Sequence, residues 1–283
     1  MRCTGTTSTK EGCSSKSQPE LAVAIKSFAP QVTDPSFDPG AASITARLRH
    51  FQVELTVLQM ASHPNIVRIL AEGSDFFALE LIPNSLFSLI KAQGKISQDK
   101  ASRLLNDLVL GVNALYSAGW CHMDIKPCNA LIKGDSTAVL CDFGCCQLHE
   151  NGRRKIRGWL GTEAFSAPEV SDTISYRPKP CDVWSLACVF FTCVNGGPPF
   201  ENTRECPYYC MVADGHWESF WQIHQFHSGV VFSMESKERF QRLLGPGRKQ
   251  RPGVSILASE LGELQECEKT RARAGAALPP QGL

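Results

Sequence analysis

The stretch Trp120–Ile132, with the sequence WCHMDIKPCNALI, decides the fold predicted for this chain. It carries a histidine, an acid, a lysine and an asparagine in the spacing H-x-D-x-K-x-x-N, and Cys-Asp-Phe-Gly follows at Cys141–Gly144. So many polar groups close together suit neither a helix core nor a strand core. Carboxylate and amide oxygens beside a lysine suit a loop that positions a metal-bound phosphate. The rest of the chain is therefore expected to form a frame around this loop.

The composition is that of a globular protein. The chain has 283 residues, of which 43% are hydrophobic and 20% charged, enough for one large domain or two packed lobes. A net charge of +1 gives no reason to expect a nucleic acid or a membrane surface as a partner. The polar N-terminus shows no secretory signal, so an intracellular, cytoplasmic protein is expected. The longest apolar run, Val183–Val194, is too short to span a bilayer and predicts a buried helix.

The 13 cysteines do not indicate a disulfide framework, because the chain is large and nothing marks it as secreted. No pair has C-x-x-C spacing. Cys206 and Cys210, like Cys141 and Cys145, have no matching second pair. Reduced thiols in the core and loops are expected, with a zinc site as the alternative.

Strand patterns come first along the chain and helix patterns second. The expected strands are Leu21–Phe28, Asn65–Ala71, Asp75–Ile82, Ala130–Ile132 and Ala138–Cys141. The expected helices are Ser43–Met60, Gln98–Ala118 after an N-cap at Ser97, and Val183–Asn195. The polar, aperiodic segment Gln147–Leu160 is expected to be a surface loop. This order predicts an α+β fold with two lobes and a cleft near Pro83.

The same patterns divide the chain into segments. Residues 1–20 are a polar N-terminal segment, residues 21–82 a small β-rich lobe and residues 83–265 a larger helical lobe. Residues 266–283, rich in Arg, Ala, Pro and Gly, are expected to be a disordered tail.

Further motifs flank the central loop in a fixed order. Val-Ala-Ile-Lys ends at Lys26, a helix glutamate follows at Glu54, and after the loop come Asp-Phe-Gly at Asp142–Gly144 and Ala-Pro-Glu at Ala167–Glu169. With the loop itself, this set resembles the eukaryotic protein-kinase family over roughly residues 21–261. Each motif alone is weak, but the complete ordered set makes coincidence negligible. The resemblance implies the two-lobed protein-kinase fold.

The resemblance also implies how ATP and Mg²⁺ would be held. Lys26, kept in place by Glu54, would contact the α- and β-phosphates. Asn129 and Asp142 would supply oxygen ligands to Mg²⁺.

The nucleotide positions of the family can be carried over in the same way. Glu80 to Ile82 would form the hinge, whose backbone groups bind adenine, with Leu79 as the gatekeeper residue. Leu131 is a further implied nucleotide-binding position, and Cys141 would face the nucleotide pocket or be a small buried residue.

Two residues of the central loop would act on the substrate. By resemblance, Asp124 would orient the acceptor hydroxyl and take its proton, and Lys126 would lie near the transferred phosphoryl group. Lysine at position 126 and Gly161-Thr162 before Ala-Pro-Glu resemble serine/threonine kinases, with Thr162 placed to bond Asp124 and Lys126. The implied partner is a protein substrate with a serine or threonine acceptor.

Other implied positions are structural. His122 would pack on Phe143, and Glu169 would pair with Arg251 across the helical lobe. Asp182 would begin the central buried helix and brace the catalytic loop through its backbone amides.

The glycine-rich loop expected before Lys26 departs from the family pattern. Gly5 and Gly12 are the only glycines there, so this loop is either degenerate or truncated. Either would weaken the cradling of phosphates by backbone N–H groups. The alternative to an active enzyme is therefore a catalytically impaired pseudokinase that acts as a scaffold. A small-molecule kinase of the aminoglycoside type would share the loop motif, but would lack Ala-Pro-Glu.

A second departure concerns regulation. Met123 stands where most family members have an arginine that pairs with a phosphorylated residue of the activation loop. The corresponding loop, Cys145–Gly161, contains no Ser, Thr or Tyr. We therefore expect a serine/threonine kinase that does not depend on activation-loop phosphorylation. Together with Val-Ala-Ile-Lys and Asp-Phe-Gly-Cys, the His-Met-Asp sequence looks similar to the Mos branch. Because neither Ser85 nor Cys128 is acidic, a preference for arginine-rich substrates is not expected.

Overall fold

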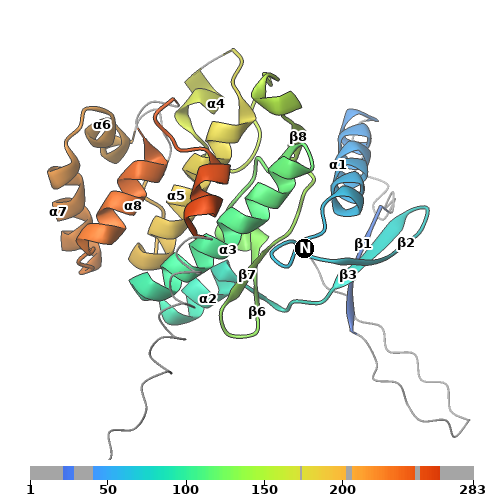
Figure 1. The fold of residues 1–283 in the computed structure, drawn as a ribbon, viewed down its shortest axis with the longest axis horizontal. Helices are drawn as coiled ribbons and strands as arrows, with labels where there is room; N and C mark the ends of the chain where they lie inside the picture. The colour runs from blue at the N-terminus through green and yellow to red at the C-terminus, as the bar shows by residue number, and fades with distance from the viewer. Residues whose placement is uncertain (1–21, 29–40, 173, 202–205, 246–248, 262–283) are drawn as a thin grey trace, which may run out of the picture.

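The computed structural model describes residues 22–28, 41–172, 174–201, 206–245 and 249–261, which form two lobes (Figure 1). A small lobe with a β-sheet and one helix is followed by a larger, mainly helical lobe. The predicted α+β fold class is therefore confirmed. The segment predicted to carry the glycine-rich loop, residues 1–20, and the predicted tail, residues 266–283, lie outside the described residues.

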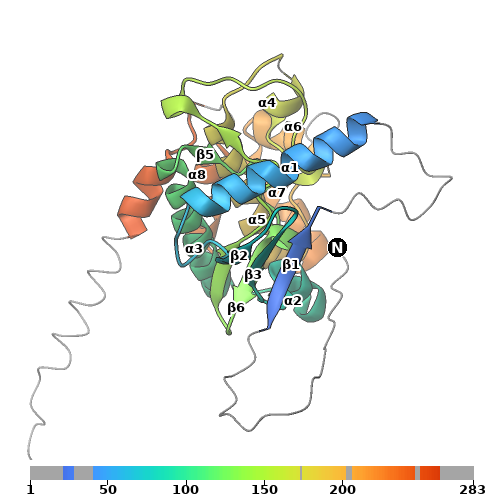
Figure 2. The same cartoon turned by 90° about the vertical axis from the view of Figure 1, so that its right-hand side faces the viewer.

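The small lobe is a three-stranded antiparallel sheet beside a long helix (Figure 2). Its strands lie in the order β1 (Val23–Ser27), β3 (Phe76–Glu80) and β2 (Ile69–Glu72). Helix α1 (Ala41–Met60) packs Phe51 against Phe77 of β3, with ring centroids 5.0 Å apart. Because residues three apart share a helix face, this contact also turns Glu54 toward the sheet, where Lys26 lies.

Strand β2 begins at Ile69, although the sequence predicted a strand from Asn65. The Asn65 carbonyl accepts a hydrogen bond from the Leu140 N–H at 2.9 Å, and the Val67 N–H donates to the Leu140 carbonyl at 2.9 Å. These backbone groups are thus paired with the large lobe and cannot join the small-lobe sheet. The segment connects the two lobes instead.

The large lobe is built around one buried helix. Its helices are α2 (Leu86–Gln93), α3 (Gln98–Ser117), α4 (Pro168–Asp172), α5 (Pro178–Asn195), α6 (Pro207–Ala213), α7 (Trp217–Ser228) and α8 (Met234–Leu244). The hydroxyl of Ser97 accepts from the Lys100 N–H at 3.4 Å, which confirms the predicted N-cap of α3. Helix α5 packs against both α3 and α8.

Helix α5 is longer than the predicted Val183–Asn195, because it begins at Pro178. Proline is tolerated in the first turn, where backbone N–H groups have no partner within the helix. Asp182 therefore lies in the second turn. The expectation that Asp182 begins this helix is wrong. No helix within the described ranges is long and apolar enough to cross a membrane.

Short strands hold the loop Trp120–Ile132 at both ends. The strands β4 (Asn84–Ser85), β6 (Ala130–Lys133) and β7 (Thr137–Leu140) form one small sheet, and β5 (Trp120–Cys121) pairs with β8 (Gln147–Leu148). Single turns of 3₁₀ helix follow at η1 (Pro127–Asn129), η2 (Glu150–Gly152) and η3 (Glu163–Phe165). The prediction of an irregular surface loop from Gln147 is wrong at its start, because β8 pairs with β5 and His149 beside it is buried.

Candidate active site

The loop Trp120–Ile132 is braced by the carboxylate of Asp182, which projects from α5. This carboxylate accepts hydrogen bonds from the backbone N–H groups of His122 and Met123, both at 2.8 Å. Met123 has a left-handed backbone with φ of 67°, which is costly for a residue with a side chain. The two hydrogen bonds stabilise this conformation. Burial raises the pKa of Asp182, although the hydrogen bonds from the two amides oppose that shift.

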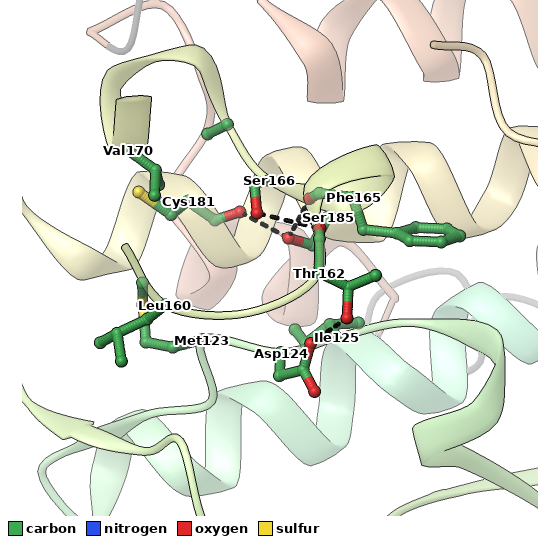
Figure 3. Close-up of a pocket in the computed structure, with 11 residues that line it drawn as sticks. Met123, Asp124, Ile125, Leu160, Thr162, Phe165, Ser166, Val170, Cys181 and Ser185 are labelled. Atoms are coloured by element: carbon green, nitrogen blue, oxygen red, sulfur yellow. Dashed lines mark hydrogen bonds between the residues drawn. The ribbon is translucent and has the colours of Figure 1, made fainter. Parts of the chain in front are cut away.

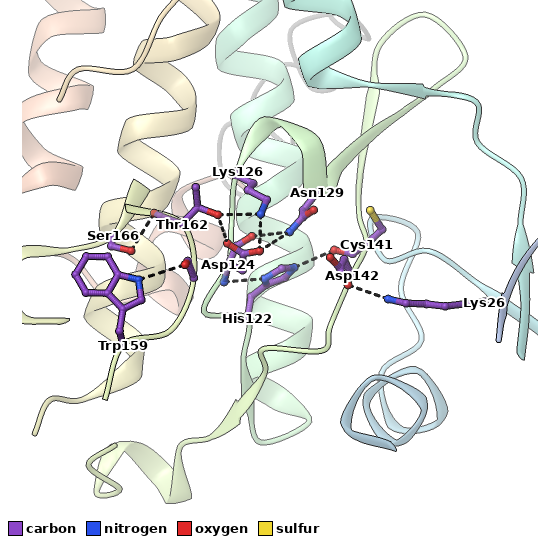
Figure 4. Close-up of polar contacts among 11 residues, drawn as sticks. Lys26, His122, Asp124, Lys126, Asn129, Cys141, Asp142, Trp159, Thr162 and Ser166 are labelled. Atoms are coloured by element: carbon purple, nitrogen blue, oxygen red, sulfur yellow. Dashed lines mark hydrogen bonds and ion pairs between the residues drawn. The ribbon is translucent and has the colours of Figure 1, made fainter. Parts of the chain in front are cut away.

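Asp124 lies at the centre of a closed hydrogen-bond network. Its Oδ1 accepts from the Thr162 hydroxyl at 2.8 Å (Figure 3). Its Oδ2 accepts from Lys126 Nζ at 2.8 Å and from Asn129 Nδ2 at 3.0 Å (Figure 4). Lys126 also donates to the Thr162 hydroxyl at 2.8 Å, so the predicted bonds of Thr162 to both residues are confirmed. The network fixes the orientation of the Asp124 carboxylate.

The charge on Lys126 is maintained by this network. Burial acts to lower the pKa of the ammonium group, but the hydrogen bond and the charge of Asp124 outweigh burial and raise it. A permanent positive charge therefore lies within 2.8 Å of the Asp124 carboxylate.

A second cluster joins the two lobes through Lys26. Its ammonium group donates to the Glu54 carboxylate of α1 and, at 2.9 Å, to Asp142 Oδ1. Burial lowers the pKa of Lys26, but Glu54 and Asp142 together outweigh burial and raise it. Burial raises the pKa of Glu54 despite the nearby ammonium, whereas Lys26 outweighs burial at Asp142 and lowers its pKa. The structure thus brings together the three residues that the sequence assigned to the phosphates and the metal.

Asn129 and Asp142 fit a magnesium site that depends on phosphate. Asn129 Nδ2 donates to the Asp124 carbonyl at 2.9 Å and to its carboxylate, which leaves the amide oxygen of Asn129 available as a ligand. Within the described ranges, no group of three His, Cys, Asp or Glu residues could hold a metal by itself. Mg²⁺ commonly takes one or two protein oxygens and completes its shell with substrate phosphate and water. This donor set matches that mode of binding.

The predicted hinge lies at the end of β3. Leu79 and Ile82 are buried, and the backbone N–H of Glu80 donates to the Arg68 carbonyl at 2.9 Å, so that amide is not free to bind adenine. The Glu80 carboxylate accepts from Lys133 Nζ at 2.7 Å and from the Arg68 N–H at 3.1 Å. Burial acts to raise the pKa of Glu80, but these partners lower it.

Two more predicted nucleotide positions, Leu131 and Cys141, lie in β6 and directly after β7. Leu131 is half-buried, while its neighbours Ala130 and Ile132 are buried, so the alternation along β6 turns Leu131 away from the large-lobe core. Cys141 is half-buried, and burial raises the pKa of its thiol to about 12. It is therefore a neutral thiol near neutral pH.

The predicted structural contacts are present. The rings of His122 and Phe143 lie 5.4 Å apart, and His122 is fully buried. The guanidinium of Arg251 donates to both carboxylate oxygens of Glu169, at 2.7 and 3.0 Å, and lies over the ring of Trp184. A bidentate pair at this depth joins the end of residues 142–169, which we call the activation segment, to the helical core.

Comparison with known proteins agrees with this geometry. The sequence model described as "Protein kinase domain" matches residues 4–261. The chain belongs to the protein kinase domain family. The kinase domain is 29% identical over 208 residues to CBL-interacting protein kinase 26 of Oryza sativa subsp. japonica, which covers 71% of this chain and 40% of that protein.

Two further relatives show similar identity. CBL-interacting serine/threonine-protein kinase 16 of Arabidopsis thaliana is 30% identical over 222 residues, covering 74% of this chain and 45% of that protein. Serine/threonine-protein kinase PKH2 of Saccharomyces cerevisiae is 30% identical over 176 residues, covering 56% of this chain and 16% of that protein. The chain thus spans less than half the length of each of these relatives.

The activation segment of this kinase domain is anchored along its length. After β8, the ring of His149 lies 2.8 Å from the Tyr116 carbonyl of α3. Ile156 exchanges backbone hydrogen bonds with Tyr176 at 2.9 and 3.0 Å, and the Tyr176 hydroxyl donates to the Gly158 carbonyl at 2.9 Å. Trp159 remains 47% exposed. From β8 to Gly158 the segment is therefore held by strand pairing and by hydrogen bonds to α3 and Tyr176.

Met123 lines a small cavity beneath this segment (Figure 3). Its side chain is buried, and apolar neighbours Leu160, Phe165 and Val170 lie around the same cavity. None of the residues that line the cavity is Arg, Lys or His. The cavity at Met123 thus offers no basic side chain that could pair with a phosphate.

Sequence reasoning missed two residues that shape the site. Lys133 holds the hinge through Glu80, and Tyr176 holds the activation segment through Ile156 and Gly158. Only the position of Lys133 at the end of a strand that follows the catalytic loop could have suggested its role. No local pattern marks Tyr176, because its partners lie far away in the sequence.

Proposed function

We propose that this chain is a serine/threonine protein kinase that transfers the γ-phosphoryl group of Mg·ATP to hydroxyl groups of protein substrates. The observation that carries the proposal is the network in which Lys126, Asn129 and Thr162 fix the carboxylate of Asp124. A second support is that Lys26 bridges Glu54 and Asp142, which places a cation beside the donor set for the metal.

Each residue has a physical task in this proposal. Bound Mg·ATP would supply the phosphoryl group and the charge neutralisation that phosphoryl transfer needs. Asp124 orients the acceptor hydroxyl and accepts its proton, while Lys126 offers positive charge where negative charge develops. Lys26 binds phosphate oxygens, and Glu54 keeps its ammonium in place.

The serine/threonine class has two supports. Lys126 and Thr162 bond each other and Asp124, as the sequence pattern of that class predicts. Two of the relatives described above also carry serine/threonine kinase in their names. A protein substrate with a serine or threonine acceptor follows as the proposed partner.

We further propose that the kinase works without a phosphate on its activation segment. The segment is held by β8, His149 and the Ile156–Tyr176 pairing, and the cavity at Met123 holds no cation. Treatment with a broad protein phosphatase should therefore leave the activity unchanged. A loss of activity that returned on rephosphorylation of Thr162 or of any nearby residue would contradict this.

A reducing, intracellular location, most simply the cytoplasm, belongs to the same proposal. Each of the cysteines in the described part of the chain is a free thiol, which suits a reducing compartment where ATP is available.

The test compares the purified chain with Asp142→Asn in an assay with labelled ATP, Mg²⁺ and a generic serine/threonine substrate. Asp135→Asn is the matched control, because Asp135 is an exposed acid in the turn between β6 and β7. We expect transfer by the wild type and by Asp135→Asn, but not by Asp142→Asn. Equal background signal from all three would favour the pseudokinase scaffold. Asp124→Asn should lose transfer while a fluorescent ATP analogue still binds.

A further inference from the structure

Three exposed cations flank the Ile156–Tyr176 bridge in the described structure. They are Lys155, Arg157 and Arg177, which we call the basic cluster. Ile156 and Tyr176 form an antiparallel bridge with backbone hydrogen bonds in both directions. In such a pair the next residue of one strand lies opposite the preceding residue of the other, so Lys155 faces Arg177. Arg157 lies on the other side of Ile156.

The positive charge of the basic cluster is not compensated. Like charges placed opposite one another on paired strands cost free energy. Arg177 also immediately precedes α5, where the helix dipole adds further positive potential. Among the side chains that the structure describes, none forms an ion pair with the basic cluster. By contrast, Arg154 of the same segment pairs with Glu150 at 3.1 Å.

The anion that would offset this charge cannot be a phosphate on Cys145–Gly161, because that segment contains no Ser, Thr or Tyr. The location points to the substrate. Arg157 is followed five residues later by Thr162, whose hydroxyl bonds Asp124 at 2.8 Å. Five extended residues span at most about 17 Å. In an extended substrate, a residue about five positions from the acceptor can lie at the same distance from the acceptor hydroxyl.

We infer that the basic cluster binds an acidic or phosphorylated residue of the protein substrate, within about five positions of the acceptor serine or threonine. This rests on the proposed kinase function and names its substrate class. It also agrees with the expectation that arginine-rich substrates are not preferred, because the basic cluster would repel them.

The test uses serine peptides of alanine background in which aspartate or phosphoserine stands at one of the five positions on either side of the acceptor. The enzymes are the wild type, the double variant Arg157→Ala/Arg177→Ala, and Arg154→Ala as the matched control from the same segment. We expect the best acidic peptide to exceed the all-alanine peptide about fivefold or more in kcat/KM with the wild type. The double variant should lose this preference and keep its activity on the all-alanine peptide, while Arg154→Ala keeps both. High salt should reduce the preference of the wild type.

A flat profile with the wild type, or the same preference in the double variant, would overturn the inference. If phosphoserine alone is preferred, the substrate must be phosphorylated beforehand; if aspartate suffices, acidic sequence is enough. If no peptide is phosphorylated, the proposed function fails. The anion site is then tested separately, by the fluorescence anisotropy of a labelled phosphoserine peptide. Loss of peptide binding in the double variant would support the anion site. Equal binding by the wild type and the double variant would refute it.

Discussion

Replacing Asp182 by asparagine should separate catalysis from stability. The Asp182 carboxylate accepts from two backbone amides, those of His122 and Met123, at 2.8 Å each. Asparagine has nearly the same shape but only one acceptor oxygen, and its NH₂ group would point at the other N–H. One buried amide would thus lose its partner.

The size of the effect follows from these contacts. An unsatisfied buried N–H costs about 1–3 kcal/mol. The left-handed backbone of Met123 costs a similar amount, on the order of 1–3 kcal/mol, so the loop would leave its present conformation for much of the time. If the active loop conformation is destabilised by that free energy, kcat should fall about 10- to 100-fold. The free energy of unfolding should fall by only about 1–2 kcal/mol, because the neutral amide avoids the burial of charge that raises the pKa of Asp182.

The assay combines initial rates with urea denaturation for Asp182→Asn and for a matched control, Asp107→Asn. Asp107 also accepts from a backbone amide, that of Ala138 at 2.9 Å, but it lies outside the active site. The control should lose some stability and keep its kcat. If Asp182→Asn kept a wild-type kcat, or if both variants lost kcat to the same extent, Asp182 would not act by bracing the loop.

Three further predictions concern pH and packing. Burial raises the pKa of Glu54, so on acidification Glu54 takes up a proton at a higher pH than an ordinary glutamate, and Lys26 loses its anionic partner. The kcat/KM for ATP should therefore fall at acid pH. The variant Glu54→Gln should be slow, and its pH–rate profile should lack this acid-side fall. Gly161 has φ of 87°, and an added Cβ would lie 2.5 Å from the Met123 carbonyl oxygen. The variant Gly161→Ala should therefore lower kcat at least about tenfold and also lower Tm. A wild-type rate in this variant would contradict the close contact. Burial lowers the pKa of His224 to about 4, so between pH 6.5 and 4 the unfolded chain takes up a proton that the folded chain does not. The free energy of unfolding should therefore fall by about 2 kcal/mol between pH 7.5 and 5. Urea titrations of His224→Phe should show a smaller fall over the same pH range. An equal fall in this variant would show that other groups cause the pH dependence of stability.

The sequence was sufficient for the residues whose roles depend on fixed spacing. The pairing of Lys26 with Glu54 and of Glu169 with Arg251 is found where the motifs placed it. These pairs are set by the fold itself, and the fold is readable from the ordered motifs.

The sequence was insufficient where a contact depends on elements that meet only in three dimensions. Lys133 reaches Glu80 because β6 and β3 end near each other, and Tyr176 meets Ile156 because the chain doubles back after α4. A polar, aperiodic segment such as Gln147–Leu160 gives no local sign of such partners. The early start of α5 was missed for a different reason, because prolines usually indicate a break and here occupy a first helical turn.

The uneven burial of the indole side chains gives this protein a reporter of its own. Trp120, Trp184 and Trp221 are buried and Trp217 is half-buried, whereas Trp159 is 47% exposed on the activation segment, two residues from Arg157. A water-soluble quencher such as iodide would reach Trp159 before the three buried side chains. The quenching of Trp159 would thus follow the arrival of a peptide at the basic cluster in real time, without any attached dye.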